Sequence, residues 1–90
     1  GKVKMYLYIE NNIFINLNEI ELAIDYKEFI SKNNLVKIAG KRKILDFSTE
    51  KRKKRTAIFT EKFVYITSYT NRALKMRADE YDRLINSVVF

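Results

Sequence analysis

Short runs of branched and aromatic residues, separated by polar clusters, make up most of the first two thirds of the chain. Residues 5–9 and 13–17 have strand composition, and the polar cluster Glu10-Asn11-Asn12 between them indicates a turn. Residues 20–26 alternate apolar with small or charged side chains, which is the period-two pattern of a half-buried strand. The pattern therefore predicts a hairpin followed by a third strand.

The segment of residues 27–42 allows two interpretations. Its apolar positions recur at helical spacing, Ser31 or Asn33 is a suitable cap, and Gly40 is a suitable end, so a short helix fits. Residues 35–38 also have the composition of a short strand. We favour the short helix, which would carry Leu35, Ile38, Ala39 and Arg42 on one side.

Three further strands are expected in the middle of the chain. Residues 43–48 form one of them, and residues 56–60 and 63–68 form a hairpin around Glu61-Lys62. Because Glu-Lys is not a favoured pair for a tight turn, we expect the loop to be a residue or two longer.

The last third of the chain has the clearest helical pattern. After Thr70, a suitable N-cap, apolar residues recur at spacings of four and three with polar residues between them, and these apolar residues are Leu74, Ala78, Tyr81, Ile85 and Val88. The pattern predicts a helix over about residues 70–88. Two roles remain open for this apolar seam: docking on the chain's own sheet, or a contact between subunits, which the apolar end Val88-Val89-Phe90 supports.

These elements combine into one α+β domain, a small β-rich unit of five or six mostly antiparallel strands with a short helix and a C-terminal helix. The domain is expected to span residues 5–90. We expect residues 1–4 to be leader or artificially added residues, because the alternating pattern begins at Met5. A chain of 90 residues buries only about 60 to 65 % of its unfolded surface, so assembly into a homo-oligomer would add stability.

The composition narrows the possible functions. There is no cysteine and no histidine, which removes disulfides, thiol nucleophiles, the usual zinc ligands and the commonest general base. The carboxylates Asp25, Glu28, Asp46 and Glu50 are the remaining candidates for Mg²⁺ ligands, but they show no motif spacing. We therefore predict no enzymatic activity, no cofactor, no metal site and no small-molecule ligand. No apolar run is long enough to cross a bilayer, so we expect a cytoplasmic protein without a membrane partner.

The charge is concentrated in one region of the chain. Residues 37–55 carry the whole net charge of +7, and the other residues sum to zero. A basic region on a neutral chain is typical of polyanion binding, because each cation that docks on a phosphate releases a counterion. The alternatives are a solvated loop, a contact with a membrane surface or a nuclear-import signal. The candidate nucleic-acid contacts are the run Lys51, Arg52, Lys53, Lys54 and Arg55 and the nearby Lys41, Arg42 and Lys43.

Three stretches of the chain together resemble a known family. They are the opening residues 5–9 with 13–15, the strand of residues 19–25, and the block of residues 56–68 followed by residues 73–78. They resemble the small bacterial extracellular-matrix regulatory proteins, the RemA and RemB family, in its RemB-like branch. The matched features are apolar spacings with a few polar positions and include no catalytic motif.

The resemblance implies a small β-rich subunit that forms a ring-like homo-oligomer and binds promoter DNA, in the better-known branch as an activator of biofilm-matrix genes. It also implies a basic pair in the loop before the penultimate strand, which corresponds here to some of residues 51–55. The family's arginine at the entrance to the third strand is replaced here by Asn18 or Glu19, so one expected DNA contact is absent. Duplex DNA and a second copy of the chain are thus the expected partners.

Two other functions remain open. RNA or single-strand binding would use tyrosines as stacking platforms, although strand tyrosines more often pack, and the candidates are Tyr6, Tyr8, Tyr65 and Tyr69. A protein-interaction scaffold would use the acidic helix face of Asp79, Glu80 and Asp82.

Overall fold

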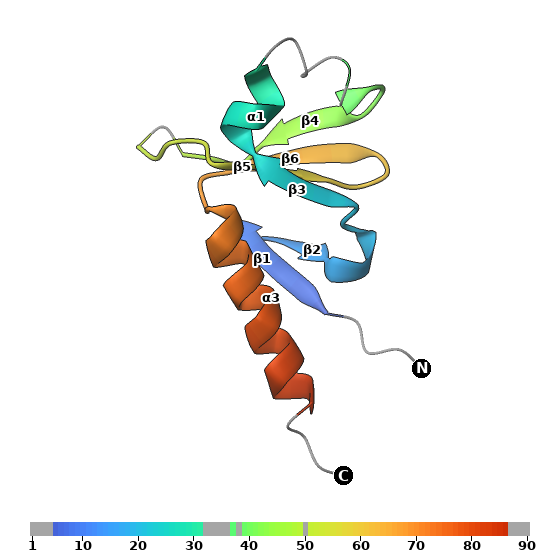
Figure 1. The fold of residues 1–90 in the computed structure, drawn as a ribbon, viewed down its shortest axis with the longest axis vertical. Coiled ribbons are helices and arrows are strands. Elements are labelled where there is room, and N and C mark those ends of the chain that lie inside the picture. The colour runs from blue at the N-terminus through green and yellow to red at the C-terminus, as the bar shows by residue number, and fades with distance from the viewer. Residues whose placement is uncertain (1–4, 32–36, 38, 50, 87–90) are drawn as a thin grey trace.

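The structure is a computed structural model that describes the backbone of residues 5–31, 37, 39–49 and 51–86, and the side chains of these residues up to residue 80. This part of the chain contains six strands in two sheets, a short helix and a long C-terminal helix (Figure 1). The predicted α+β class is confirmed. No helix in this part is both long and apolar enough to cross a membrane.

The connections between the elements differ in length, and the longest stand on either side of β4. The strands are β1 (Tyr6–Glu10), β2 (Ile13–Asn16), β3 (Leu22–Asp25), β4 (Lys43–Asp46), β5 (Thr56–Phe59) and β6 (Phe63–Thr67). The helices are a 3-10 turn (Leu17–Glu19), α1 (Tyr26–Ile30) and α3 (Asn71–Asn86). The predicted strands agree with these bounds to within two residues at every end. The loop between β5 and β6 holds three residues, Thr60 to Lys62, one more than the pair Glu61-Lys62, as expected.

The two sheets differ in size and pairing. β1 and β2 form an antiparallel hairpin, and the other strands form a four-stranded sheet in the order β3-β5-β6-β4. β5 pairs antiparallel with both of its neighbours, whereas the edge strand β4 runs parallel to β6. The sheet is therefore mostly antiparallel, and its two central strands are consecutive in the chain.

Both faces of the four-stranded sheet are covered, because α1 lies on one face and the hairpin β1–β2 on the other (Figure 1). Successive residues of a strand point to opposite faces. Accordingly Ala57 and Phe59 of β5 pack with Phe29 of α1, while Ile58 packs with Leu7 and Ile9 of the hairpin and its neighbours. Burying Phe29, which is 1 % exposed, contributes about 2–3 kcal/mol.

The segment of residues 27–42 contains helix, as favoured, although not all of it is described. Helix α1 forms at Tyr26–Ile30, and Lys37 and Ala39 are also helical, while residues 32–36 and 38 lie outside the described residues. Tyr26 departs from the prediction, because the alternating pattern assigned it to the end of the preceding strand. Tyr26 fits both the alternation and a helical spacing with Phe29, and burial of Phe29 selects the helix. Gly40 has a φ of 59°, which suits its expected role at the end of a segment.

The turn of the first hairpin is built on backbone conformations that few residues adopt. Glu10, Asn11 and Asn12 have positive φ angles of 148°, 55° and 62°. Asparagine is enriched in the left-handed region, which explains the Asn-Asn pair. The pairing of β1 with β2 shifts its register between Tyr8 and Glu10, and Glu10 is only 4 % exposed although its side chain is a carboxylate. It therefore needs polar partners.

Those partners come from the end of β6. The Glu10 carboxylate accepts hydrogen bonds from the Ser68 N–H (2.7 Å), from the Thr67 hydroxyl (3.0 Å) and from the Ser68 hydroxyl. Burial raises the pKa of Glu10, but these hydrogen bonds and the positive charge of Arg52 outweigh it, so its pKa lies below the ordinary value of 4.5. The ionised carboxylate thus holds the hairpin against the sheet.

The C-terminal helix α3 begins as predicted. The Thr70 hydroxyl accepts the Ala73 N–H (3.1 Å), which is the expected N-cap, and the helix is described as far as Asn86. Arg77 holds α3 to β1: it donates to the Tyr8 carbonyl (3.1 Å), and its guanidinium carbon lies 4.2 Å from the centre of the Tyr69 ring. The described first half of α3 is thus packed on its own chain.

We expect Glu10→Gln to be about 1–3 kcal/mol less stable than the parent near pH 7, because a neutral amide weakens charge-assisted hydrogen bonds in a buried site. Since the pKa of Glu10 is lowered by folding, its contribution is present above pH 4.5 and disappears as the pH falls through the folded-state value. Urea denaturation at pH 7 and pH 3 would show the difference narrowing. Glu61→Gln, at an exposed carboxylate, is the control; a difference that does not change with pH would contradict this role.

Candidate nucleic-acid surface

The predicted basic run lies in the connection between β4 and β5, which extends away from the sheet in Figure 1. Both ends of the connection are fixed to the sheet by main-chain hydrogen bonds: Phe47 N–H to the Ile66 carbonyl (2.9 Å) and Arg55 N–H to the Thr67 carbonyl (2.9 Å). The Arg55 carbonyl also accepts the Tyr26 N–H (2.8 Å). We call residues 47–55 the basic loop; Glu50 within it lies outside the described residues.

The five cations of the basic loop are all exposed, but they are not equivalent. Lys54 forms an ion pair with Asp46 (2.7 Å) and donates to the Ser48 hydroxyl (3.0 Å), which in turn donates to Asp46 (2.6 Å). Burial raises the pKa of Asp46, but the hydrogen bonds from Lys54 and Ser48 outweigh burial, so the pKa of Asp46 lies below its ordinary value. The hydrogen bond to Asp46 in turn raises the pKa of Lys54. Lys54 therefore anchors the loop. Among the described residues none pairs with the other four cations, Lys51, Arg52, Lys53 and Arg55.

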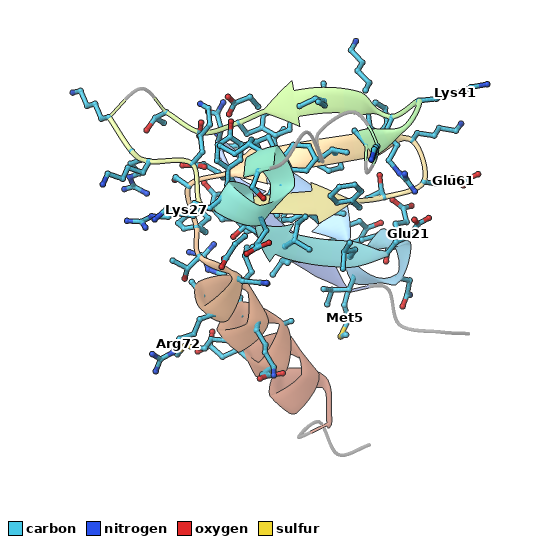
Figure 2. The ribbon with its side chains drawn as sticks, turned by 45° about the horizontal axis from the view of Figure 1, so that its top comes forward. Met5, Glu21, Lys27, Lys41, Glu61 and Arg72 are labelled. Atoms are coloured by element: carbon cyan, nitrogen blue, oxygen red, sulfur yellow. The ribbon has the colours of Figure 1, made fainter. Side chains whose placement is uncertain are left out.

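The remaining predicted contacts lie at the other end of the sheet. Lys41, Arg42 and Lys43 precede β4, whereas the basic loop follows it, and the Lys43 N–H bonds to the Lys62 carbonyl (3.0 Å) in the β5–β6 loop. Figure 2 shows Lys41 near Glu61, at the opposite end from Lys27. The structure thus divides the eight predicted cations into two groups that do not form one surface.

Arg42 has a packing role at that end. Its Nε donates to the Thr60 carbonyl (2.7 Å), its Nη2 pairs with Glu21 (2.9 Å), and its guanidinium carbon lies 5.5 Å from the centre of the Phe59 ring. These contacts tie the β5–β6 loop to the chain that leads into β3. Carboxylates are mixed with the cations here: Glu19, Glu21 and Glu61 line a cavity of about 490 Å³ together with Lys62. This end therefore attracts anions less than the basic loop does.

Two cations that the sequence did not single out lie on the side of the basic loop. Lys27 is in the first turn of α1 and Arg72 in the first turn of α3, and both point to the side from which the loop emerges (Figure 2). Asp25 pairs with Thr56 across β3 and β5, which brings the start of α1 beside the end of the loop. Finding Lys27 beside the basic loop would have required knowing that β3 pairs with β5, and a single sequence does not reveal a pairing between such distant segments.

Part of the apolar seam predicted on the C-terminal helix packs against the chain's own core. Leu74 is 3 % exposed and belongs to the core beneath the hairpin, so it docks α3 on its own domain, which is one of the two roles left open. Ala78 is half-buried. Tyr81 and Ile85 lie in the last turns of α3, where only the backbone is described, and Val88 lies outside the described residues.

The tyrosines that were considered as stacking platforms are mostly occupied. Arg77 lies over the rings of both Tyr8 and Tyr69, and the Tyr65 ring stacks on Phe47 with centroids 5.9 Å apart. Tyr6 is 47 % exposed, on the outer side of the hairpin. Among the described residues, no three carboxylates gather in a way that could hold a metal ion.

We expect Arg42→Gln to lower the free energy of unfolding by about 1–2 kcal/mol, because it removes a charge-assisted hydrogen bond to the Thr60 carbonyl and a cation over Phe59. Lys41→Gln removes the same charge from an exposed neighbour and should leave the stability unchanged. Thermal denaturation of the two variants would separate packing from net charge. Equal stability of the two variants would show that the Arg42 contacts add nothing to folding.

Comparison with models of known protein families, and with curated proteins, finds no match for this chain. What the protein does must therefore be inferred from its own surface, where the exposed cations of the basic loop are held at one end of a rigid sheet.

Proposed function

We propose that this chain is a DNA-binding regulatory protein that binds duplex DNA through the basic loop and acts as a homo-oligomer in the cytoplasm. The observation that carries the proposal is the geometry of the loop. Lys51, Arg52, Lys53 and Arg55 are exposed, while the two ends of the loop are held by main-chain hydrogen bonds to β6. Cations fixed on a scaffold lose less conformational entropy on binding than those on a free tail.

Duplex DNA is favoured over a single strand by the state of the aromatic side chains. Binding of single strands needs aromatic faces free to stack on bases beside a basic groove. Tyr8 and Tyr69 already stack with Arg77, and Tyr65 stacks with Phe47. The basic loop itself contains lysine and arginine rather than aromatic residues at its tip. Contacts to the phosphate backbone, which position a protein without reading sequence, should dominate.

The homo-oligomer is part of the same proposal. Four cations without an ion-pair partner among the described residues give one subunit only a few phosphate contacts, which yield weak binding at physiological salt. Several loops on one assembly act through effective concentration and can gain orders of magnitude in affinity. Large apolar side chains that could contribute to subunit contacts are exposed on several elements: Tyr6, Phe14, Leu22, Ile30, Ile44 and Met76. By resemblance, we propose extracellular-matrix or biofilm genes as the regulated targets.

The first test compares two triple variants of equal charge. Replacing Lys51, Arg52 and Lys53 with alanine should weaken binding of a 20-base-pair duplex strongly and lower the log–log salt slope by about 0.9 for each lost phosphate contact. Replacing Lys41, Lys43 and Lys62, at the opposite end of the sheet, should have a much smaller effect. Equal losses in both variants would mean that net charge, and not the basic loop, attracts the DNA.

The second test concerns assembly. Light scattering of the purified chain should give a mass of several times 10.8 kDa. The same mass is expected for the variant of Lys51, Arg52 and Lys53, because its substitutions lie on the proposed DNA surface. A mass of one chain at all concentrations would contradict the oligomer.

A further inference from the structure

A small cavity lies at the base of the basic loop. It has a volume of about 180 Å³ and is lined by Asp25, Lys27, Lys54, Arg55 and Thr70. A water molecule occupies about 30 Å³ in the liquid, so the cavity has room for one phosphate group with part of its hydration shell. The lining residues come from the end of β3, the start of α1, the end of the basic loop and the start of α3.

The walls of this cavity are fixed to one another by the main chain. The Tyr26 N–H donates to the Arg55 carbonyl (2.8 Å), which joins the start of α1 to the end of the loop next to Lys27. The Thr56 hydroxyl donates to the Tyr69 carbonyl (2.7 Å), which joins β5 to the residue before Thr70. The cavity is therefore preformed, and a ligand would not need to order its walls.

The polar groups of the lining suit an oxyanion. Lys54 is already paired with Asp46, which leaves Lys27 and Arg55 as the cations that no described carboxylate engages in an ion pair. Arginine presents a planar fork of donors and lysine a compact positive charge, and both bind phosphate oxygens. The Thr70 hydroxyl accepts the Ala73 N–H, so its own hydrogen remains available for donation.

Asp25 is the one lining group that opposes an anion. It occupies the N-cap position of α1, yet its side chain makes no capping hydrogen bond. Its carboxylate makes no ion pair with a described residue either. Removing this negative charge would therefore cost the fold little, but it would raise the potential inside the cavity.

We propose that this cavity holds one backbone phosphate of the bound DNA, with Lys27 and Arg55 as its ligands and Asp25 as a charge that limits the affinity. This inference rests on the proposed DNA-binding function and adds a defined position to it. The DNA backbone then continues from the tip of the basic loop toward the start of α3, where Arg72 points to the same side as Lys27 (Figure 2).

Salt-titrated binding of a 20-base-pair duplex to single-residue variants of the full chain tests the proposal. Lys27→Gln should weaken binding and lower the log–log salt slope by about 0.9, the value for one phosphate contact. Lys62→Gln removes the same charge at the opposite end and should leave the slope unchanged. Circular dichroism and thermal denaturation of each variant establish that the fold is intact.

A charge change of the opposite sign gives the second arm. Asp25→Asn should strengthen DNA binding, whereas Glu61→Gln, which removes a negative charge at the far end, should have little effect. Inorganic phosphate at millimolar concentration should compete with DNA only weakly, because one isolated phosphate lacks the contacts to the loop. Tight binding of inorganic phosphate that leaves DNA binding unchanged would assign the cavity to the free ion instead and overturn the proposal.

The outcomes separate this inference from the proposed function. If the variant of Lys51, Arg52 and Lys53 loses DNA binding while Lys27→Gln keeps the parent slope, the phosphate position is wrong and the basic loop remains the DNA surface. If Asp25→Asn weakens binding with an intact fold, the phosphate position is also wrong. If neither the loop variant nor Lys27→Gln changes binding, the proposed DNA-binding function itself fails.

Discussion

The antiparallel pairing of β5 with β6 is the constraint on which the rest of this structure depends. All four residues of β5 are buried, and β6 is buried at Val64, Ile66 and Thr67, because α1 covers one face of the sheet and the hairpin β1–β2 the other. Strands covered on both faces leave only the two ends of the sheet free for polar groups. One end takes the short loop from Thr60 to Lys62, and the other must carry the long basic loop.

The end that carries the basic loop is also where the segments of the chain are fastened together. The Thr67 carbonyl accepts from Arg55, the Thr67 hydroxyl donates to the Ile9 carbonyl and to Glu10, and the Thr56 hydroxyl donates to the Tyr69 carbonyl. A buried anion, Glu10, thus lies near exposed cations, and the charge of Arg52 helps to keep it ionised. Among the described residues no buried side-chain nitrogen or oxygen atom lacks a hydrogen-bond partner, and satisfied buried networks of this kind make the structure rigid. The cations above it are held in place while their side chains remain in water.

Rigid presentation and charge separation together explain why one group of cations suits a polyanion better than the other. Lys41 and Lys43 flank Arg42, whose guanidinium is used for packing, and Glu21 and Glu61 are close by. Around the basic loop, Asp46 pairs with Lys54, and the other nearby acid is Asp25, which lines the cavity at the base of the loop together with Lys54. Opposite charges at short distance cancel much of a surface potential, whereas a group of like charges adds up. Lysines and arginines therefore have different consequences at the two ends of the sheet.

The sequence by itself determined the local elements and the charge. Period-two alternation, the polar turn at Glu10-Asn11-Asn12 and the cap at Thr70 predict strands, turn and helix correctly, since each depends on neighbours within a few residues. The exposed run of residues 51–55 was equally visible, because five cations in succession cannot be buried.

Only the tertiary structure decided which of these parts meet. The helix at Tyr26–Ile30 follows from the burial of Phe29 against β5, and the separation of Arg42 from the basic loop follows from the direction of β4. The position of Lys27 beside Arg55 follows from the pairing of β3 with β5, which joins residues some thirty positions apart. Such pairings depend on how distant apolar faces fit together, and no local pattern in a single sequence encodes that fit.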